Sequence, residues 1–427
     1  MNIRMVGRLG VSAMSVAILA AILPVAAGCG SVAAGPDGGG TAGSGATAGT
    51  TGSGGTTGSG GMAGGRGGAG GTGGSGGAAG MFTPTRDVDI LFMIDNSSST
   101  ELLQENLRNN FPTFMTTLQA SPGGLPNIHL AVITSDMGAG DGSIAGCDMT
   151  GGQQGIFRYI PGASSCTTGL MPNQTYITNI GGVANYTGNL ADVFSCIARV
   201  GSSGCGFEQP LAAIVRALGA DGKAPPAENA GFLRPSALLF IVIVTNEDDC
   251  SVPAGSGLFD VASNTTLASA LGPPANFRCN EFGHLCNGMK PPRKAPNSSV
   301  SDMVTLTGCT SAEQSGMLTP VATFVSQLRA LKQFPDDQIL ISAIVGPPTP
   351  YTVTWKNAPT TDTGPWPVIA HSCTSTDSSF ADPAVRVANL VSAFGTNGLT
   401  SGVCDTSYAS TFDKLAQALG RALEPPH

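Results

Sequence analysis

Residues 88–99 read VDILFMIDNSSS, and this stretch decides the fold. Its first seven residues are mostly apolar and rich in strand formers, and a polar turn follows at once. The next segment, 100–118, carries apolar residues at helical spacing and therefore predicts a helix. Pro112 lies inside this segment and predicts a kink or a break there. The apolar positions of the helix are Leu103, Leu107, Phe111, Phe114, Met115 and Leu118.

The run ALLFIVIV at 237–244 is apolar at every position. A half-exposed strand would alternate with polar residues, so this run predicts a strand buried on both faces of a parallel sheet. Further strands are predicted at 128–134 and 339–345. Helical spacing appears at 190–197, 211–218, 321–331 and 412–423, and Pro210 suits the first turn of the second of these helices. Strands that alternate with helices predict an α/β fold, with a doubly wound and mostly parallel sheet flanked by helices.

The stretch 251–315 shows no convincing period and is rich in Pro, Asn, Gly and Cys. We interpret it as a long, disulfide-pinned insertion between the central strand and the next helix.

The first 80 residues have a different character. Residues 1–28 carry Arg4 and Arg8 followed by an apolar run, which is typical of an export signal. The sequence AAGC at 26–29 resembles the bacterial lipoprotein cleavage box, which implies cleavage before Cys29 and acylation of that residue. Gly30 rather than an aspartate follows, so we expect a lipid anchor in the cell envelope, at the outer membrane.

Residues 29–80 are then an acylated cysteine followed by a tether. Nearly half of residues 30–80 are glycine, and most others are Ala, Ser or Thr. Such a segment cannot bury enough apolar surface to offset the cost of ordering its backbone. As a random coil it would span roughly 40 Å. The folded domain is therefore expected over 81–427.

The chain has 427 residues and a net charge of −8, and only 11% of its residues are charged. This balance argues against a nucleic-acid partner, which requires a basic surface. Apart from Cys29, ten cysteines remain, without a CxxC pair or a zinc-like spacing, so they predict disulfides. We expect the local pairs Cys147–Cys166, Cys196–Cys205 and Cys373–Cys404. The other four, Cys250, Cys279, Cys286 and Cys309, are expected to pair among themselves.

The loop after the first strand, DNSSS at 95–99, holds the candidate site. In open parallel sheets, ligands bind where the carboxyl ends of the strands meet their loops. Asp95, Ser97 and Ser99 would place one carboxylate and two hydroxyls around one point. Hard oxygen donors of this kind suit Mg²⁺. Alternatively, the serines only cap the following helix.

The strand followed by DNSSS resembles the DxSxS element of the metal-ion-dependent adhesion site in von Willebrand factor A (vWA) domains. The resemblance covers residues 81–427 apart from the insertion. It implies a vWA or Rossmann-like fold and a Mg²⁺ site, also open to Mn²⁺ or Ca²⁺, held by Asp95, Ser97 and Ser99. An open coordination position on such an ion takes an acidic side chain of a protein partner.

Two other elements depart from the family pattern. Where a threonine is expected, the loop 204–209 reads GCGFEQ, in which Glu208 either supplies the missing oxygen or favours the helix N-terminus. Where an aspartate is expected after the central strand, the residue is Asn246, a neutral side chain. The flanking acids at 247–249 are candidates to compensate. Asp136 and Asp141, after the second strand, are interpreted as loop residues rather than ligands.

Catalytic alternatives find little support in the sequence. It has four histidines, two of them in loops at His284 and His371, and no GxSxG, P-loop or HExxH motif. We therefore expect a binding module for adhesion or interaction, and no enzyme. The alternatives are a structural envelope lipoprotein with a degenerate metal site and, less favoured, a secreted hydrolase.

Overall fold

The computed structural model describes residues 82–140, 147, 151–160, 166, 169–260, 262, 265–359 and 362–424. The export signal, Cys29, the tether and Asp141 therefore lie outside the described residues. In the part of the chain that is described, no helix is long and apolar enough to span a membrane.

A seven-stranded sheet forms the centre of the domain, in the order β16-β11-β7-β1-β2-β4-β5. Its parallel part consists of β1 (Asp87–Ile94), β2 (Asn127–Thr134), β7 (Leu238–Val244), β11 (Ile339–Val345) and β16 (Gly398–Gly402). At one side of the sheet, β4 (Ile177–Ile180) pairs antiparallel with β2, and the edge strand β5 (Val183–Ala184) pairs antiparallel with β4. Every residue of β7 is buried, as expected for a strand covered on both faces. The doubly wound, mostly parallel sheet that the vWA resemblance implied is confirmed.

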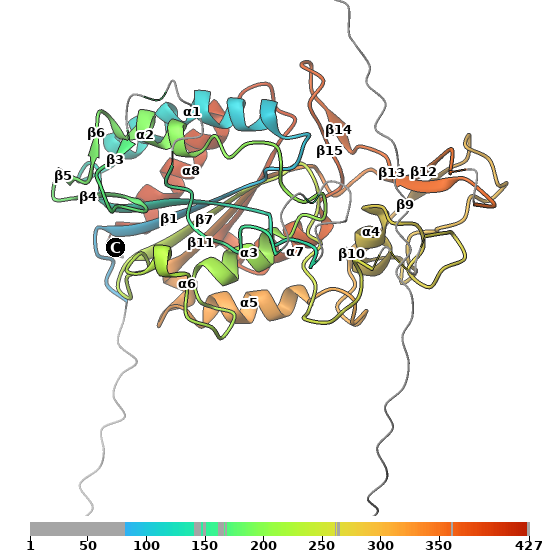
Figure 1. Ribbon diagram of the computed structural model, residues 1–427. Helices are drawn as coiled ribbons and strands as arrows, with labels where there is room; N and C mark the ends of the chain where they lie inside the picture. The colour runs from blue at the N-terminus through green and yellow to red at the C-terminus, as the bar shows by residue number, and fades with distance from the viewer. Residues whose placement is uncertain are drawn as a thin grey trace, which may run out of the picture. The chain divides into compact units, whose positions relative to one another are not determined.

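Helices cover both faces of this sheet (Figure 1). One face packs against α1 (Glu101–Ala120), α2 (Leu190–Ile197) and α8 (Ala409–Ala422). The other packs against α3 (Pro210–Ala217), α5 (Val321–Arg329) and α7 (Val385–Ser392), with the short α6 (Pro335–Gln338) before β11. Pro112 lies inside α1, which continues through it, so the predicted break is absent.

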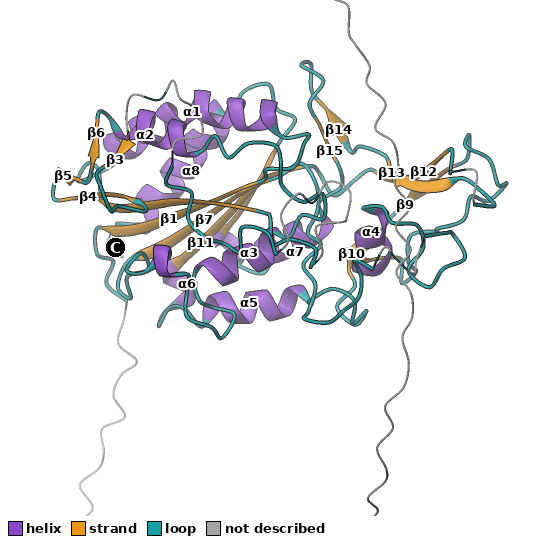
Figure 2. Cartoon of the chain, in the orientation of Figure 1, coloured by secondary structure: helices purple, strands orange, loops and turns teal. Residues whose placement is uncertain are grey.

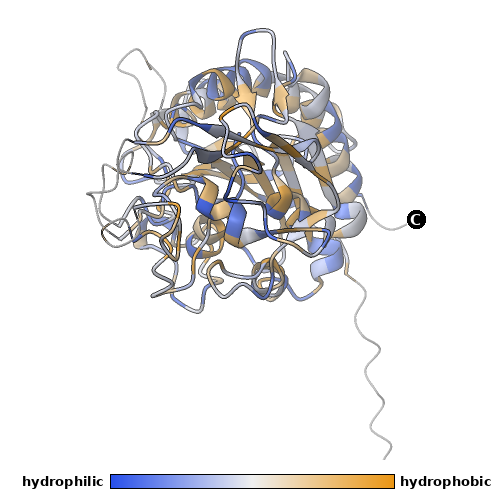
Figure 3. Ribbon diagram, turned by 90° about the vertical axis from the view of Figure 1, so that its right-hand side faces the viewer, coloured by the Kyte–Doolittle hydropathy of each residue, from blue (hydrophilic) through white to orange (hydrophobic). Residues whose placement is uncertain are grey.

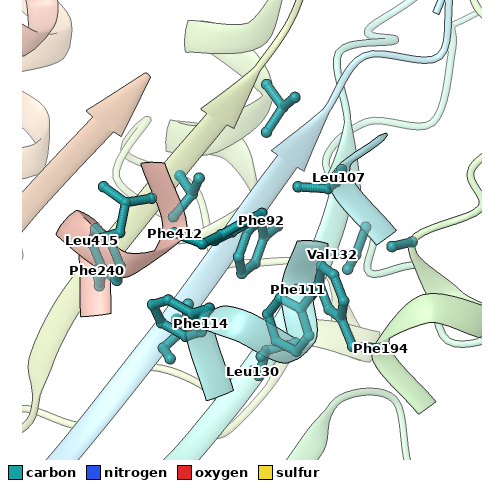
Figure 4. Packing of buried hydrophobic residues seen from close by; sticks show 14 of the residues in the cluster. Phe92, Leu107, Phe111, Phe114, Leu130, Val132, Phe194, Phe240, Phe412 and Leu415 are labelled. Carbon is teal, nitrogen blue, oxygen red and sulfur yellow. The ribbon is translucent and has the colours of Figure 1, made fainter. Parts of the chain in front are cut away.

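Alternating side chains of each strand reach the two helical layers, because successive residues point to opposite faces. Phe92 of β1 packs with Phe111 and Phe194, whose rings stack with centroids 3.7 Å apart (Figure 4). Phe114 and Phe412 join α1 to α8 in the same cluster. In the view onto the right-hand side of Figure 1, the strands are hydrophobic and lie behind more hydrophilic loops (Figure 3). This packing holds the strand ends, and the loops that follow them, in place.

A smaller body lies beyond the carboxyl ends of the strands (Figure 2). It contains α4 (Phe277–Gly283), β8 (His284–Cys286), β9 (Met303–Leu306) and β10 (Cys309–Ser311), all from the expected insertion. Its three-stranded sheet, β13-β12-β9, also uses β12 (Tyr351–Lys356) and β13 (Trp366–Ile369). The segment after β11 therefore supplies two of the three strands of this sheet. Short pairs elsewhere are β3 (Gly169–Leu170) with β6 (Tyr186–Thr187), and β14 (Cys373–Thr374) with β15 (Phe380–Ala381).

All ten cysteines of the domain form disulfides. Cys373–Cys404 is as predicted, and the insertion pairs internally through Cys250–Cys279 and Cys286–Cys309. The predicted pairs Cys147–Cys166 and Cys196–Cys205 are wrong, because the structure joins Cys147 to Cys205 and Cys166 to Cys196. The reason is topological. Cys196 is in α2, against which β3 packs, and Cys166 lies shortly before β3, whereas Cys205 clusters with Cys147 and Cys250.

Candidate functional site

The Asp95 carboxylate lies at the carboxyl edge of the sheet and is fully buried. The register of β1 with β7 sets Ile94 beside Val244, so Asp95 and Thr245 follow on adjacent strands. The Thr245 hydroxyl donates to Asp95 Oδ2 at 2.7 Å. The Ser97 N–H at 2.8 Å and the Ser135 hydroxyl at 3.2 Å donate to Oδ1. These bonds hold the carboxylate in one orientation. Burial raises its pKa despite them, because the ionised form loses the hydration that it would have in water.

Ser97, Ser99 and Asn246 lie around this carboxylate. Ser97 is 4% exposed and its hydroxyl oxygen has no hydrogen-bond partner. The Asn246 amide Nδ2 donates to Ser99 Oγ at 3.0 Å, while its Oδ1 is buried without a partner. A hydrogen bond therefore joins Asn246 to Ser99, as expected if both residues belong to one site. Asn96 Oδ1 is also buried and unpaired, although the sequence pattern did not single that residue out.

Glu208 adds a second carboxyl group on the same edge. It is 2% exposed, and its Oε1 has no hydrogen-bond partner. Burial raises its pKa well above the usual range, and the nearby charges of Glu247 and Asp95 raise it further. Burial, then the charge of Asp382, raises the pKa of Glu247 to about 8. Glu208 and Glu247 also hydrogen-bond to each other, which raises the pKa of Glu208 and lowers that of Glu247.

Asp248 and Asp249 have structural roles and cannot compensate for Asn246. The Asp248 carboxylate accepts the backbone N–H groups of Arg386 and Val387 at the start of α7, and its Oδ2 lies 2.8 Å from His284 Nε2. Asp249 accepts the Leu211 N–H in the first turn of α3 and pairs with the Arg386 guanidinium at 3.0 Å. Of the three flanking acids, Glu247 alone faces the site.

Asp136 also proves to be a loop residue, as interpreted. Its Oδ1 accepts the Gly138 N–H at 2.8 Å, which closes the turn after β2.

The buried oxygens test whether a metal ion fits here. Ser97 Oγ, Glu208 Oε1 and Asn246 Oδ1 are buried acceptors without partners, and such atoms are rare in folded proteins unless something binds them. Together with Asp95 they form an all-oxygen set, which suits a hard divalent cation. Among the described residues, no three His, Cys, Asp or Glu side chains group closely enough to hold an ion by themselves. A divalent cation at this site would therefore also need the hydroxyl and amide oxygens as ligands. Because those oxygens are neutral, the ligand set carries little negative charge.

Sequence reasoning missed Thr245 and Ser135 as members of the site, and it named Glu247 only as one of three acids that could compensate for Asn246. Thr245 and Ser135 are the first residues after β7 and β2, the two parallel neighbours of β1. Because parallel strands end at one edge, the positions directly after each predicted strand were the available signal.

Comparison with known proteins gives matches to solved structures alone. No protein-family model and no curated protein matches the sequence. The pilus adhesin SpaC from Lactobacillus rhamnosus GG, in its open conformation, is similar at 13% identity over 79% of this chain, with a TM-score of 0.30. The chain spans 30% of the length of SpaC. The vWF domain of the type V pili tip protein Mfa5 from Porphyromonas gingivalis is similar at 11% identity, with a TM-score of 0.32, over 82% of this chain and 99% of that one.

Proposed function

We propose that the protein is an exported lipoprotein, anchored to the cell envelope through Cys29, whose folded domain binds a protein partner through a divalent cation. The observation that carries this proposal is the group of unpaired buried oxygens beside Asp95, on Ser97, Glu208 and Asn246. Buried acceptors without a donor are costly, and a cation removes that cost. In this proposal the domain binds and does not catalyse.

Asp95, Ser97 and Ser99 would hold the ion, with Glu208 and Asn246 completing the protein's share. When bound, Mg²⁺ offers an open coordination position to a carboxylate of the partner. The chain's own contribution is orientation. Thr245 and Ser135 fix the Asp95 carboxylate, and Asn246 positions the Ser99 hydroxyl. Because these contacts precede binding, little side-chain ordering remains to oppose it.

The rival function is a structural envelope lipoprotein whose metal site has decayed. Asn246 supports it, since a neutral amide replaces a charge and already bonds to Ser99.

Calorimetric titration of the purified protein with MgCl₂ and MnCl₂ separates the two functions. Binding that is lost in Asp95→Ala supports the metal-dependent module. The matched control is Asp136→Ala, which removes a carboxylate from the neighbouring loop and should leave binding intact. Absence of divalent binding in the wild-type protein would establish the structural alternative. Recovery of envelope proteins on the immobilised domain, with and without EDTA, then tests the role of the metal in partner binding.

A further inference from the structure

We infer that a cleft beside the candidate metal site binds a cationic side chain, a lysine or an arginine, of the protein partner. The cleft has a volume of about 410 Å³ and lies between the insertion and the carboxyl edge of the sheet. We call it the insertion cleft. Its acidic residues are Glu247 and Asp382, and its apolar walls include Pro274, Phe277, Pro367 and Phe380.

The inner end of the insertion cleft meets a small polar cavity of about 20 Å³. The two spaces share Glu247, Asn276, Asn280 and Asp382 as lining residues. Glu208 lines the small cavity, where its Oε1 is buried without a partner. A space of this size holds one small polar group, such as a water molecule or an ammonium head. The inner end is therefore built for a hydrogen-bond donor.

In the described part of the chain, neither acid of the cleft pairs with a lysine or an arginine, and Asp382 pairs with His371. Glu247 Oε2 accepts the amide of Asn276 at 2.9 Å, and Asp382 Oδ1 lies 2.7 Å from His371 Nδ1. Lys356 also lines the cleft, but it is exposed, and within the described part of the chain it forms no ion pair with either carboxylate. A lysine or arginine that enters the cleft gains hydrogen bonds and Coulomb attraction from the two carboxyl groups. An acidic side chain would instead be repelled by both.

The walls of the cleft suit the stem of a long side chain. Phe277 and Pro367 are buried, and Phe380 stacks on His371 with ring centroids 3.8 Å apart. Lysine and arginine lay their aliphatic stems along apolar surface and keep the charged head on a polar partner. An aromatic face next to the head adds a favourable cation–π contact. The cleft therefore offers apolar surface for the aliphatic stem and carboxyl groups for the charged head of the same side chain.

This inference rests on the proposed role in protein binding, but not on the metal. The ion would be held chiefly by Asp95, Ser97 and Ser99, whereas the cation of the partner would contact Glu247 and Asp382; Glu208 is the one residue that both would approach. The two can therefore fail separately.

The test is to probe an array of random peptides with the purified protein in MgCl₂. Selected peptides should be enriched in Lys or Arg. Their affinity should fall roughly tenfold or more in Glu247→Gln/Asp382→Asn, because a buried charge pair is lost. The matched control is Asp336→Asn/Asp337→Asn, which removes the same charge from two exposed residues of α6 and should change affinity little. Equal losses in both double variants would show general attraction to an acidic protein and would overturn the cleft.

A second variant keeps both acids in place. Ala275→Arg introduces a cation at the wall of the cleft and should block the selected peptides, provided that its melting temperature equals that of the wild type. Enrichment of Lys or Arg should persist when the array is probed in EDTA, so that a failure of the metal site, seen by titration, is distinguishable from a failure of the cleft. Selection of acidic peptides that is abolished by Lys356→Ala would refute the inference.

Discussion

Replacing Asn246 with aspartate should tighten Mg²⁺ binding and, at the same time, destabilise the metal-free protein. Asn246 is 2% exposed, and its amide contacts Ser99 Oγ at 3.0 Å. An aspartate of the same shape can accept the Ser99 hydroxyl, so the contact survives with its direction reversed. The change adds one negative charge to a site in which Asp95 is the carboxylate of the DxSxS motif.

The magnitude follows from electrostatics. Two unit charges 4 Å apart at an effective dielectric constant of 20 interact by about 4 kcal/mol, and a divalent ion doubles that figure. Desolvation of the new carboxylate and repulsion from Asp95 and Glu208 offset most of it. We expect a net gain of about 1.4–2.8 kcal/mol, which is roughly 10- to 100-fold in affinity. Without metal, the same repulsion should lower the free energy of unfolding by about 1–3 kcal/mol.

Calorimetric titration and thermal melting, each with EDTA and with MgCl₂, measure both effects. Asn179→Asp is the matched control, since Asn179 pairs with Ile128 near the opposite end of the sheet. It should change neither quantity appreciably. If Asn246→Asp leaves affinity unchanged while Glu208→Gln abolishes it, then Glu208 is the second anion and Asn246 does not contact the ion.

Three further predictions follow from the same contacts. The Cys250–Cys279 disulfide closes the loop after Glu247, so its replacement by serines should weaken Mg²⁺ binding and lower the free energy of unfolding by roughly 2–4 kcal/mol. Serines at Cys286 and Cys309 should lower the free energy of unfolding without changing Mg²⁺ affinity. Equal Mg²⁺ affinities in the two variants would contradict this prediction. In EDTA the melting temperature should fall as pH rises from about 4.5 to about 8, because Glu247 keeps its proton in the folded state and releases it in the unfolded chain. Glu247→Gln should flatten this pH dependence. An unchanged slope in that variant would disprove the assignment to Glu247. Cys29→Ser should move the protein from detergent-extracted membranes to the soluble fraction, and unchanged partitioning would exclude the lipid anchor.

Much of the fold was predictable because its signals are local. Burial on both faces shows directly as the unbroken apolar run at 237–244, and strand Ile339–Val345 begins and ends where predicted. The antiparallel strand β4 and the helix α7 were not predicted, since both segments are short. The pairing of β9 with β12 was also missed, because it joins segments separated by a whole strand and helix of the main sheet.

For the candidate site too, part was predictable from the sequence and part was not. Asp95, Ser97 and Ser99 form a contiguous motif whose position after a strand is visible in the sequence. The sequence also showed that Asn246 stands where a charge is expected. It could not show which of the acids at 247–249 faces the site, because adjacent side chains in a loop point in directions that the packed partners decide.

By itself, then, the sequence determined the central strands of the sheet, the edge of the sheet at which Asp95 lies, and the even set of cysteines. The tertiary structure decided the rest. It assigned Asp248 and Asp249 to the starts of two helices, left Glu208 and Glu247 against each other, and joined Cys147 to Cys205. The physical reason is that hydrophobic periodicity encodes burial along one element, whereas hydrogen bonds, ion pairs and disulfides depend on which elements meet in space.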